Sequence, residues 1–69
     1  MKFGDWVRTA RRFHDLTPIE LATKAHISKS LIYKIELGTA SPSLRSAERI
    51  CRAMGFELWR ALKIVAESK

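Results

Sequence analysis

The sequence contains few of the residues that cross-link or interrupt a small protein. Its 69 residues include one cysteine, two prolines and three glycines. The single thiol, Cys51, excludes an internal disulfide and is typical of a reducing compartment. The histidines, His14 and His26, have no thiol or carboxylate at ligand spacing, so neither a metal site nor a cofactor is predicted. Stability must therefore come from packing one small core.

Long apolar runs are also missing, and no segment approaches the roughly 20 residues that span a bilayer. The opening stretch, MKFGDWVRTARRF, lacks the apolar segment and cleavage site of a signal peptide. We therefore expect a cytoplasmic protein with no membrane partner. Strand signals are nearly absent as well, since no sustained alternation and no Asn-Gly or Asp-Gly turn occurs. The sequence predicts an all-α fold in a single domain, residues 1–69.

Positive charge is what the chain does have. Thirteen Lys and Arg residues against seven Asp and Glu residues give a net charge of +6. That balance favours a polyanionic partner, nucleic acid before an anionic membrane. Charge alone does not distinguish such a partner from an ordinary solvated basic surface.

Apolar residues recur at helical spacing in five segments, with clear helix-start signals between them. The first predicted helix covers about 5–15. The second begins with a capping box, Thr17 to Glu20, with Pro18 at its first position. The third covers 29–37, after Ser28 as N-cap and before a terminating Gly38. The expected inward residues of these helices are Phe3, Val7, Ala10, Leu16, Leu21, Ala22, Ala25, Ile32 and Ile35.

The fourth and fifth helices follow the loop TASPS. Ser41, followed by Pro42 at the first helical position, is the expected N-cap of the fourth helix, although Ser43 competes for the cap, and Gly55 ends the helix. Cys51 and Met54 are interpreted as core residues. The fifth helix covers about 57–66. The expected buried faces are Leu44, Ala47, Ile50, Cys51 and Met54 in the fourth helix, and Leu58, Leu62 and Val65 in the fifth.

Two helix starts, Thr17 and Ser28, lie only eleven residues apart. Short helices joined by a tight turn are typical of a helix-turn-helix, here about 17–37. In that motif the first helix crosses the phosphate backbone and the second lies in the major groove. Ala22 is small where the helices must touch. His26 occupies the turn position that usually requires a positive φ, which histidine adopts more readily than most residues.

Residues 16–38, LTPIELATKAHISKSLIYKIELG, resemble the XRE-type helix-turn-helix regulators, the family of phage repressors and Cro. The similarity continues through Pro42, Ser43 and Leu44 to Met54 and Gly55. It implies a five-helix, lambda-repressor-like domain that binds double-stranded DNA and is not an enzyme. The matching positions are Leu16, Thr17, Glu20, Leu21, Ala22, Ala25, Ile27, Ser28, Ser30, Ile32, Ile35, Glu36 and Gly38.

The resemblance also implies roles for individual residues. Glu36 is expected to form a structural ion pair with Arg11, because a free carboxylate would repel DNA. The positions expected to face bases are Lys29, Ser30, Tyr33 and Lys34. The positions expected to contact phosphates are Thr17, Ser28, Thr39 and Ser41, to which charge adds Arg12 and Arg45.

Relatives commonly dimerise through C-terminal segments, so Trp59 and Leu62 are expected at a dimer contact. A symmetric dimer would read an inverted repeat with its recognition helices about 34 Å apart. Repression by occluding a promoter is the simplest mechanism for a chain with no separate effector domain.

The chain departs from the family at Pro18, which replaces a DNA-contacting glutamine, and at six apolar residues where polar ones are usual. We expect Phe13 and Leu37 to cover the rim of the core, and Leu31 is a candidate for packing on a thymine methyl. Trp6, Ile19 and Trp59 are expected to be harder to bury, and at least one of them is expected to face a partner. The six are Trp6, Phe13, Ile19, Leu31, Leu37 and Trp59.

These departures keep open an alternative function, a protein-binding module on the same fold. An antitoxin, or a small phage factor that binds the transcription machinery, would qualify. A third hypothesis, a membrane-surface helix at residues 56–69, is disfavoured because Glu57 and Glu67 interrupt its basic face.

Overall fold

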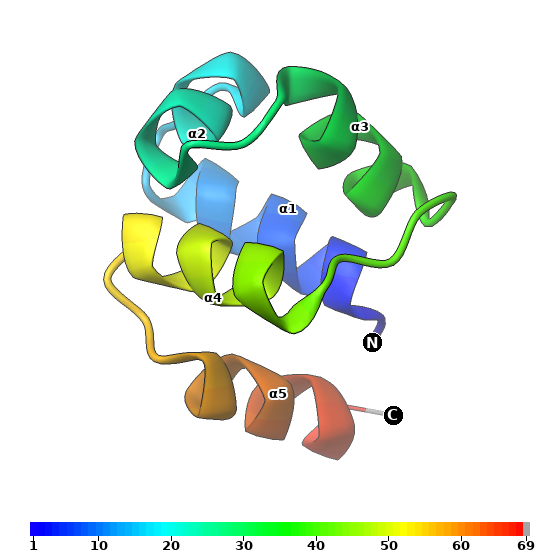
Figure 1. Cartoon of the computed structure of the whole chain (residues 1–69). Helices are drawn as coiled ribbons and strands as arrows, with labels where there is room; N and C mark the ends of the chain where they lie inside the picture. The colour runs from blue at the N-terminus through cyan, green and yellow to red at the C-terminus, as the bar shows by residue number, and fades with distance from the viewer. Residues whose placement is uncertain (69) are drawn as a thin grey trace.

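The computed structural model describes residues 1–68 and contains five α-helices and no strand within them. This confirms the prediction of an all-α fold. The helices, shown in Figure 1, are α1 (Phe3–Phe13), α2 (Pro18–Ala25), α3 (Lys29–Leu37), α4 (Leu44–Ala53) and α5 (Leu58–Glu67).

Helix α1 is central to the arrangement. It packs against α3 on one side and α5 on the other, while α2 packs against α3 and α4, and α4 also contacts α5. Helices α2 and α3 therefore lie at one end of the molecule and α5 at the opposite end (Figure 1). The two chain ends meet beside α5, where the amino group of Met1 donates to the carbonyl of Ser68.

Helix α1 begins and ends two residues before its predicted limits of about 5–15. At its start, the Asp5 carboxylate accepts a hydrogen bond from the Lys2 backbone N–H at 3.3 Å. At its end, Asp15 adopts a positive φ of 54°. The N–H of Leu16 then turns back to the Arg11 carbonyl at 3.0 Å. The left-handed residue stops the helix before Leu16, which lies half-buried beside the core.

Helices α2 and α3 begin at the predicted caps. The Thr17 hydroxyl accepts from the Glu20 N–H at 3.1 Å, and the Glu20 carboxylate accepts from the Thr17 N–H at 2.8 Å. This backbone hydrogen bond lowers the pKa of the Glu20 carboxyl. The Ser28 hydroxyl accepts from the Leu31 N–H at 3.2 Å. The bounds of α3 match the predicted 29–37, and Gly38 ends it with a left-handed φ of 80°.

Helix α4 begins two residues later than predicted, so the expectation of Ser41 as N-cap and Pro42 as first helical residue was wrong. Ser43 is the N-cap, since its hydroxyl accepts from the Ser46 N–H at 3.1 Å, and Pro42 lies outside the helix. Leu44 was predicted on the buried face, but its side chain is largely exposed. It is the first helical residue, and its Cα–Cβ bond points back past the helix end, where no other helix covers it.

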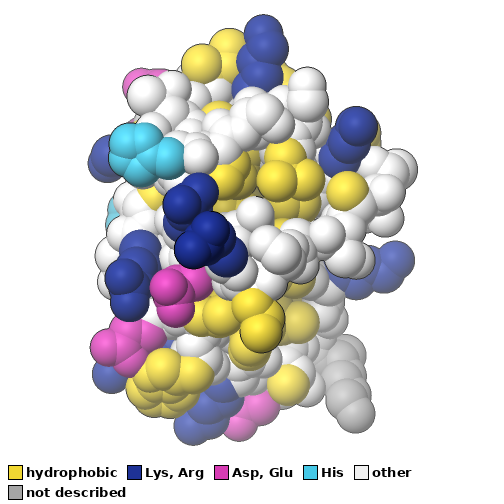
Figure 2. Space-filling model, viewed as in Figure 1, with side chains coloured by type: hydrophobic (Ala, Val, Ile, Leu, Met, Phe, Trp, Pro, Cys, Tyr) yellow, Lys and Arg dark blue, Asp and Glu magenta, His cyan; other side chains and the backbone are white. Residues whose placement is uncertain are grey.

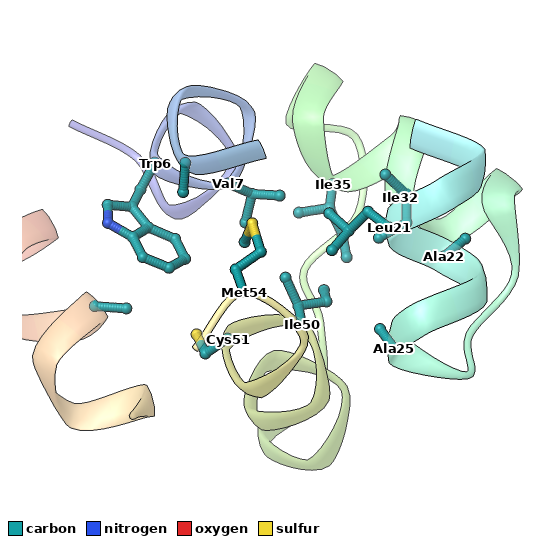
Figure 3. Close-up of a cluster of buried hydrophobic side chains, with 12 residues drawn as sticks. Trp6, Val7, Leu21, Ala22, Ala25, Ile32, Ile35, Ile50, Cys51 and Met54 are labelled. Atoms are coloured by element: carbon teal, nitrogen blue, oxygen red, sulfur yellow. The ribbon is translucent and has the colours of Figure 1, made fainter. Parts of the chain in front are cut away.

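The core is formed by side chains from all five helices. Figure 3 shows buried side chains from α1 to α4 meeting around Ile50 and Met54. Cys51 is fully buried as predicted, and this burial raises its thiol pKa to about 11. Helix α5 inserts Ala61, with Leu58 and Val65 packed beside it. Leu62, expected on the same buried face, is instead 45% exposed.

Three predictions about large apolar residues were wrong. Trp6 was expected to be hard to bury, but only 4% of it is exposed. Its indole packs between the rings of Phe3 and Phe56, at centroid distances of 5.8 and 5.3 Å. Phe13 and Leu37 were expected to cover the core rim, but are 83% and 71% exposed. Each is the last residue of its helix, beyond the final packed turn.

Gly4 allows α1 to approach α3 closely. It is buried within α1, and a Cβ atom added there would lie 2.1 Å from the carbonyl oxygen of Ile35. No side chain fits in that space, so the C-terminal end of α3 sits directly on the backbone of α1.

We expect Gly4→Ala to lower the free energy of unfolding by about 1–3 kcal/mol, the usual effect of overpacking. Alanine is otherwise favoured over glycine inside a helix, so a loss would isolate the clash. Urea unfolding followed by tryptophan fluorescence measures it. Thr9→Ala, at an exposed position of the same helix, is the control. Equal stability of the two variants would contradict the close approach.

Candidate nucleic-acid interface

Helix α3 is anchored by one face and exposed on the other. Ile32 and Ile35 are buried in the core, and Glu36 is also buried. The four side chains predicted to face bases all lie on the exposed side, and they are Lys29, Ser30, Tyr33 and Lys34. Hydroxyl and amine donors on a rigid, outward-facing helix are suited to binding the edges of bases.

The turn between α2 and α3 has the geometry that the sequence predicted. His26 is left-handed, with φ 58° and ψ 43°, and its side chain is exposed. The following N–H, of Ile27, donates to the Ala22 carbonyl at 3.0 Å. Ala22 itself is buried, so the two helices approach closely at this small residue.

The predicted ion pair between Arg11 and Glu36 is present. The Arg11 guanidinium donates to both carboxylate oxygens, at 2.8 and 3.0 Å, and also to the Leu16 carbonyl at 2.8 Å. The hydrogen bond with Glu36 is the main cause of the raised Arg11 pKa. The Glu36 carboxylate therefore points towards α1, where Arg11 neutralises its charge, and away from the exposed face of α3.

Arg8 also binds Glu36, a contact that sequence reasoning missed. Its Nη2 donates to the Glu36 carbonyl at 2.8 Å, and its Nε lies 3.6 Å from a carboxylate oxygen. The available signal was the spacing of Arg8 and Arg11, three residues apart on one helix face. Two arginines of α1 therefore bind the same residue of α3.

The six predicted phosphate-contacting residues all have exposed side chains. The hydroxyls of Thr17 and Ser28 accept capping bonds and still carry their own donors. The Thr39 hydroxyl is engaged, since it donates to the Lys34 carbonyl at 3.3 Å. Within residues 1–68, neither Arg12 nor Arg45 forms an ion pair. The Thr17 and Ser28 hydroxyls and the two guanidinium groups can therefore donate to an external anion, whereas the Thr39 hydroxyl must first leave the Lys34 carbonyl.

The residues predicted at a dimer contact lie on α5. Trp59 is 57% exposed, and its indole N–H donates to the Glu57 carboxylate. The Arg60 guanidinium lies 5.1 Å from the Trp59 ring centroid. Trp59, Leu58 and Leu62 line a groove of about 400 Å³ together with Glu48, Arg52 and Glu57. Figure 2 shows hydrophobic side chains on the lower part of the molecule, over α4 and α5, with charged groups beside them.

Residues 1–68 form five short helices, and none of them has the length and apolar composition of a membrane-spanning segment. No three His, Cys, Asp or Glu side chains in that range group closely enough to hold a metal ion.

Comparison with known proteins identifies the family. A family profile described as "Helix-turn-helix" matches residues 7–58. The chain is 33% identical over 58 residues to the immunity repressor protein of Bacillus phage phi105, an alignment that covers 84% of this chain. The chain belongs to the XRE-type helix-turn-helix family. The alignment with this XRE-type chain covers only 40% of the length of the phage repressor.

A solved structure in the family supports the same fold. The crystal structure of the clp gene regulator ClgR from Corynebacterium glutamicum matches with a TM-score of 0.88 and 26% identity. The match covers 96% of this chain and 70% of ClgR. XRE-type members are DNA-binding transcriptional regulators, and the matched residues include α2, α3 and the turn that joins them.

Removing the carboxylate of Glu36 should strongly destabilise this XRE-type domain. Glu36→Gln leaves the Arg11 guanidinium, with only 11% of its side chain exposed, without its anion. We expect a loss of about 3 kcal/mol in the free energy of unfolding. Urea unfolding measures the loss, with Glu48→Gln as the control, because its partner Arg52 is mostly exposed and 3.9 Å away. A change of less than about 1 kcal/mol in both variants would show that the buried pair contributes no more than a surface pair.

Proposed function

We propose that this protein is a sequence-specific transcriptional repressor that binds an inverted-repeat operator as a homodimer, with α3 in the major groove. The observation that carries the proposal is the division of α3 into two faces. Its isoleucines and Glu36 fix it to the body of the domain, and its donor side chains are exposed.

The base contacts follow from the chemistry of the exposed face. The amines of Lys29 and Lys34 donate to O6 or N7 of guanine, and the Ser30 hydroxyl contacts either kind of base. Tyr33, about half exposed, reaches a thymine methyl or a phosphate. Pro18 opens α2 with no donor, so affinity depends more heavily on basic residues than in relatives with glutamine at this position.

The phosphate contacts supply most of the non-specific affinity. The exposed hydroxyls of Thr17, Ser28, Thr39 and Ser41 and the guanidinium groups of Arg12 and Arg45 hold the backbone on both sides of α3. The N-terminal N–H groups of α2 and α3 add donors. With a net charge of +6, binding should weaken steeply as salt rises, because counterions are released from DNA.

Repression, rather than activation, is supported by the relative named as an immunity repressor. A dimer on a promoter blocks access to the DNA directly. No additional activity of the protein is needed for that effect.

Lys29→Ala and Lys34→Ala should each reduce sequence preference, whereas Arg12→Ala should weaken binding to all duplexes alike. Losing a base contact typically costs about 1–3 kcal/mol at one position of the site. The operator is first selected from random duplexes, and fluorescence anisotropy then compares it with a scrambled duplex at several salt concentrations.

These measurements distinguish sequence-specific contacts with bases from non-specific attraction to the phosphates. An enriched palindrome supports both DNA reading and two-fold symmetry. The DNA-binding proposal fails if the wild-type protein shows no salt-sensitive binding to any duplex.

We propose further that the homodimer forms through α5. Trp59 and Leu62 are large, partly exposed side chains beside an apolar groove. That groove carries Glu48, Arg52 and Glu57, so charges of both signs border it although the chain as a whole is strongly basic. Two basic subunits associate most readily where their local charges balance.

Trp59→Ala should shift the protein towards monomer, because the largest apolar contact of the interface is lost. Sedimentation velocity over a range of concentrations measures the mass. Phe13→Ala is the control, since Phe13 is a comparably exposed aromatic residue at the end of α1. A concentration-independent monomer for the wild type and for Trp59→Ala would overturn the dimer proposal.

The exposed apolar side chains support one other candidate function, binding of a protein partner by an antitoxin or a phage factor. Ile19, Trp59, Phe13 and Leu37 are all exposed, and Trp6 no longer contributes because it is buried. A stoichiometric protein partner retained at high salt, and lost in Trp59→Ala, would favour this function. The two functions are compatible in one chain.

A further inference from the structure

We propose that Arg8 is a positioning residue for DNA reading, which sets the angle of α3 on α1 and thereby the location of the base-facing side chains. The inference rests on the proposed function of α3. Arg8 is directed towards α3 and binds Glu36, so it acts through the recognition helix.

Helix α1 contacts the end of α3 at three points on a single face. Gly4 brings the α1 backbone against the Ile35 carbonyl, and Arg8 and Arg11 bind Glu36. Gly4, Arg8 and Arg11 are spaced i, i+4 and i+7, so they lie along one line of the helix. The last turn of α3 is thus fixed along about two turns of α1.

The Arg8 contact differs from the other two because its guanidinium forms a hydrogen bond with the backbone of α3, at the Glu36 carbonyl. The carbonyls in the last turn of a helix lack intrahelical partners. In α3, the Lys34 and Ile35 carbonyls accept from the N–H groups of Thr39 and Gly38. The Glu36 carbonyl accepts from Arg8. This cap is supplied by a different helix, and its positive charge is favourable at a helix C-terminus.

Arg11 does not substitute for this contact. It binds the carboxylate of Glu36, which is joined to the helix through rotatable bonds. The backbone carbonyl moves only when α3 itself moves. Losing Arg8 would remove its own longer ion pair with Glu36, keep the Arg11–Glu36 pair and free the axis of α3 to tilt.

Small tilts matter because the base-facing residues lie far from the fixed end. Lys29 is seven residues before Glu36, or about 10 Å along the helix. A tilt of about 10° at Glu36 displaces Lys29 by about 2 Å, whereas hydrogen bonds to bases require donor–acceptor distances within a few tenths of an ångström. Phosphate contacts from long surface side chains tolerate such shifts better. Base reading should fail before non-specific affinity does.

The test compares Arg8→Met with Lys63→Met, which removes the same charge from an exposed position of α5. The quantity measured is the ratio of Kd for a scrambled duplex to Kd for the selected operator, at one salt concentration. We expect Arg8→Met to lower this ratio about tenfold, the effect of impairing one base contact. Kd for the scrambled duplex should change no more than in the control.

A second measurement uses the free protein and does not depend on DNA. Residual dipolar couplings report the angle between α1 and α3, which should change in Arg8→Met and stay constant in Lys63→Met. An unchanged angle overturns the proposal, even if the wild type binds no operator. If Arg8→Met lowers the stability of the domain but leaves the Kd ratio unchanged, the proposal is also overturned. Failure of the DNA-binding proposal is recognised separately, as the absence of salt-sensitive binding by the wild type.

Discussion

The buried carboxylate of Glu36 joins α3 to the body of the domain. Its two oxygens bind Arg11, its carbonyl binds Arg8, and the preceding carbonyl lies against the backbone of Gly4. A buried charge is stable only when such partners surround it. The surface that we propose for DNA binding depends on this contact, because the exposed residues of α3 are placed by the position of its last turn.

The opposite side of α1 carries the other half of the architecture. There Trp6 packs between Phe3 and Phe56, which draws the start of α5 onto α1. One helix thus contacts both α3, which we propose reads DNA, and α5, which we propose forms the dimer contact. If α5 forms the dimer contact, the distance between the α3 helices of the two subunits depends on how α1 packs against α3 and α5. A change in that packing would alter the spacing of the half-sites that the dimer fits.

The proposed DNA contacts and the proposed dimer contact lie on different parts of the molecule. The base-facing donors lie on α3, and Arg12 of α1 and Arg45 of α4 add to the phosphate contacts, whereas α5 presents Trp59 and Leu62 beside acids and bases together. A surface with mixed charge is suited to another basic protein chain, and a surface rich in unpaired basic groups to a polyanion. This division is compatible with a chain that binds DNA and a second copy of itself at once.

Local signals in the sequence were sufficient to predict the all-α class, the helix-turn-helix, the bounds of α3 and the caps at Thr17 and Ser28. Caps and helical periodicity act within about four residues, so they can be read without knowledge of the fold. The partner of Glu36 was predicted from the family resemblance, since Arg11 lies 25 residues away in the chain. The fold was needed to establish that Trp6 is buried, that Phe13 and Leu37 are exposed, and that Arg8 binds the end of α3. Those outcomes depend on where one helix crosses another, and that crossing is set by contacts between residues far apart in the chain.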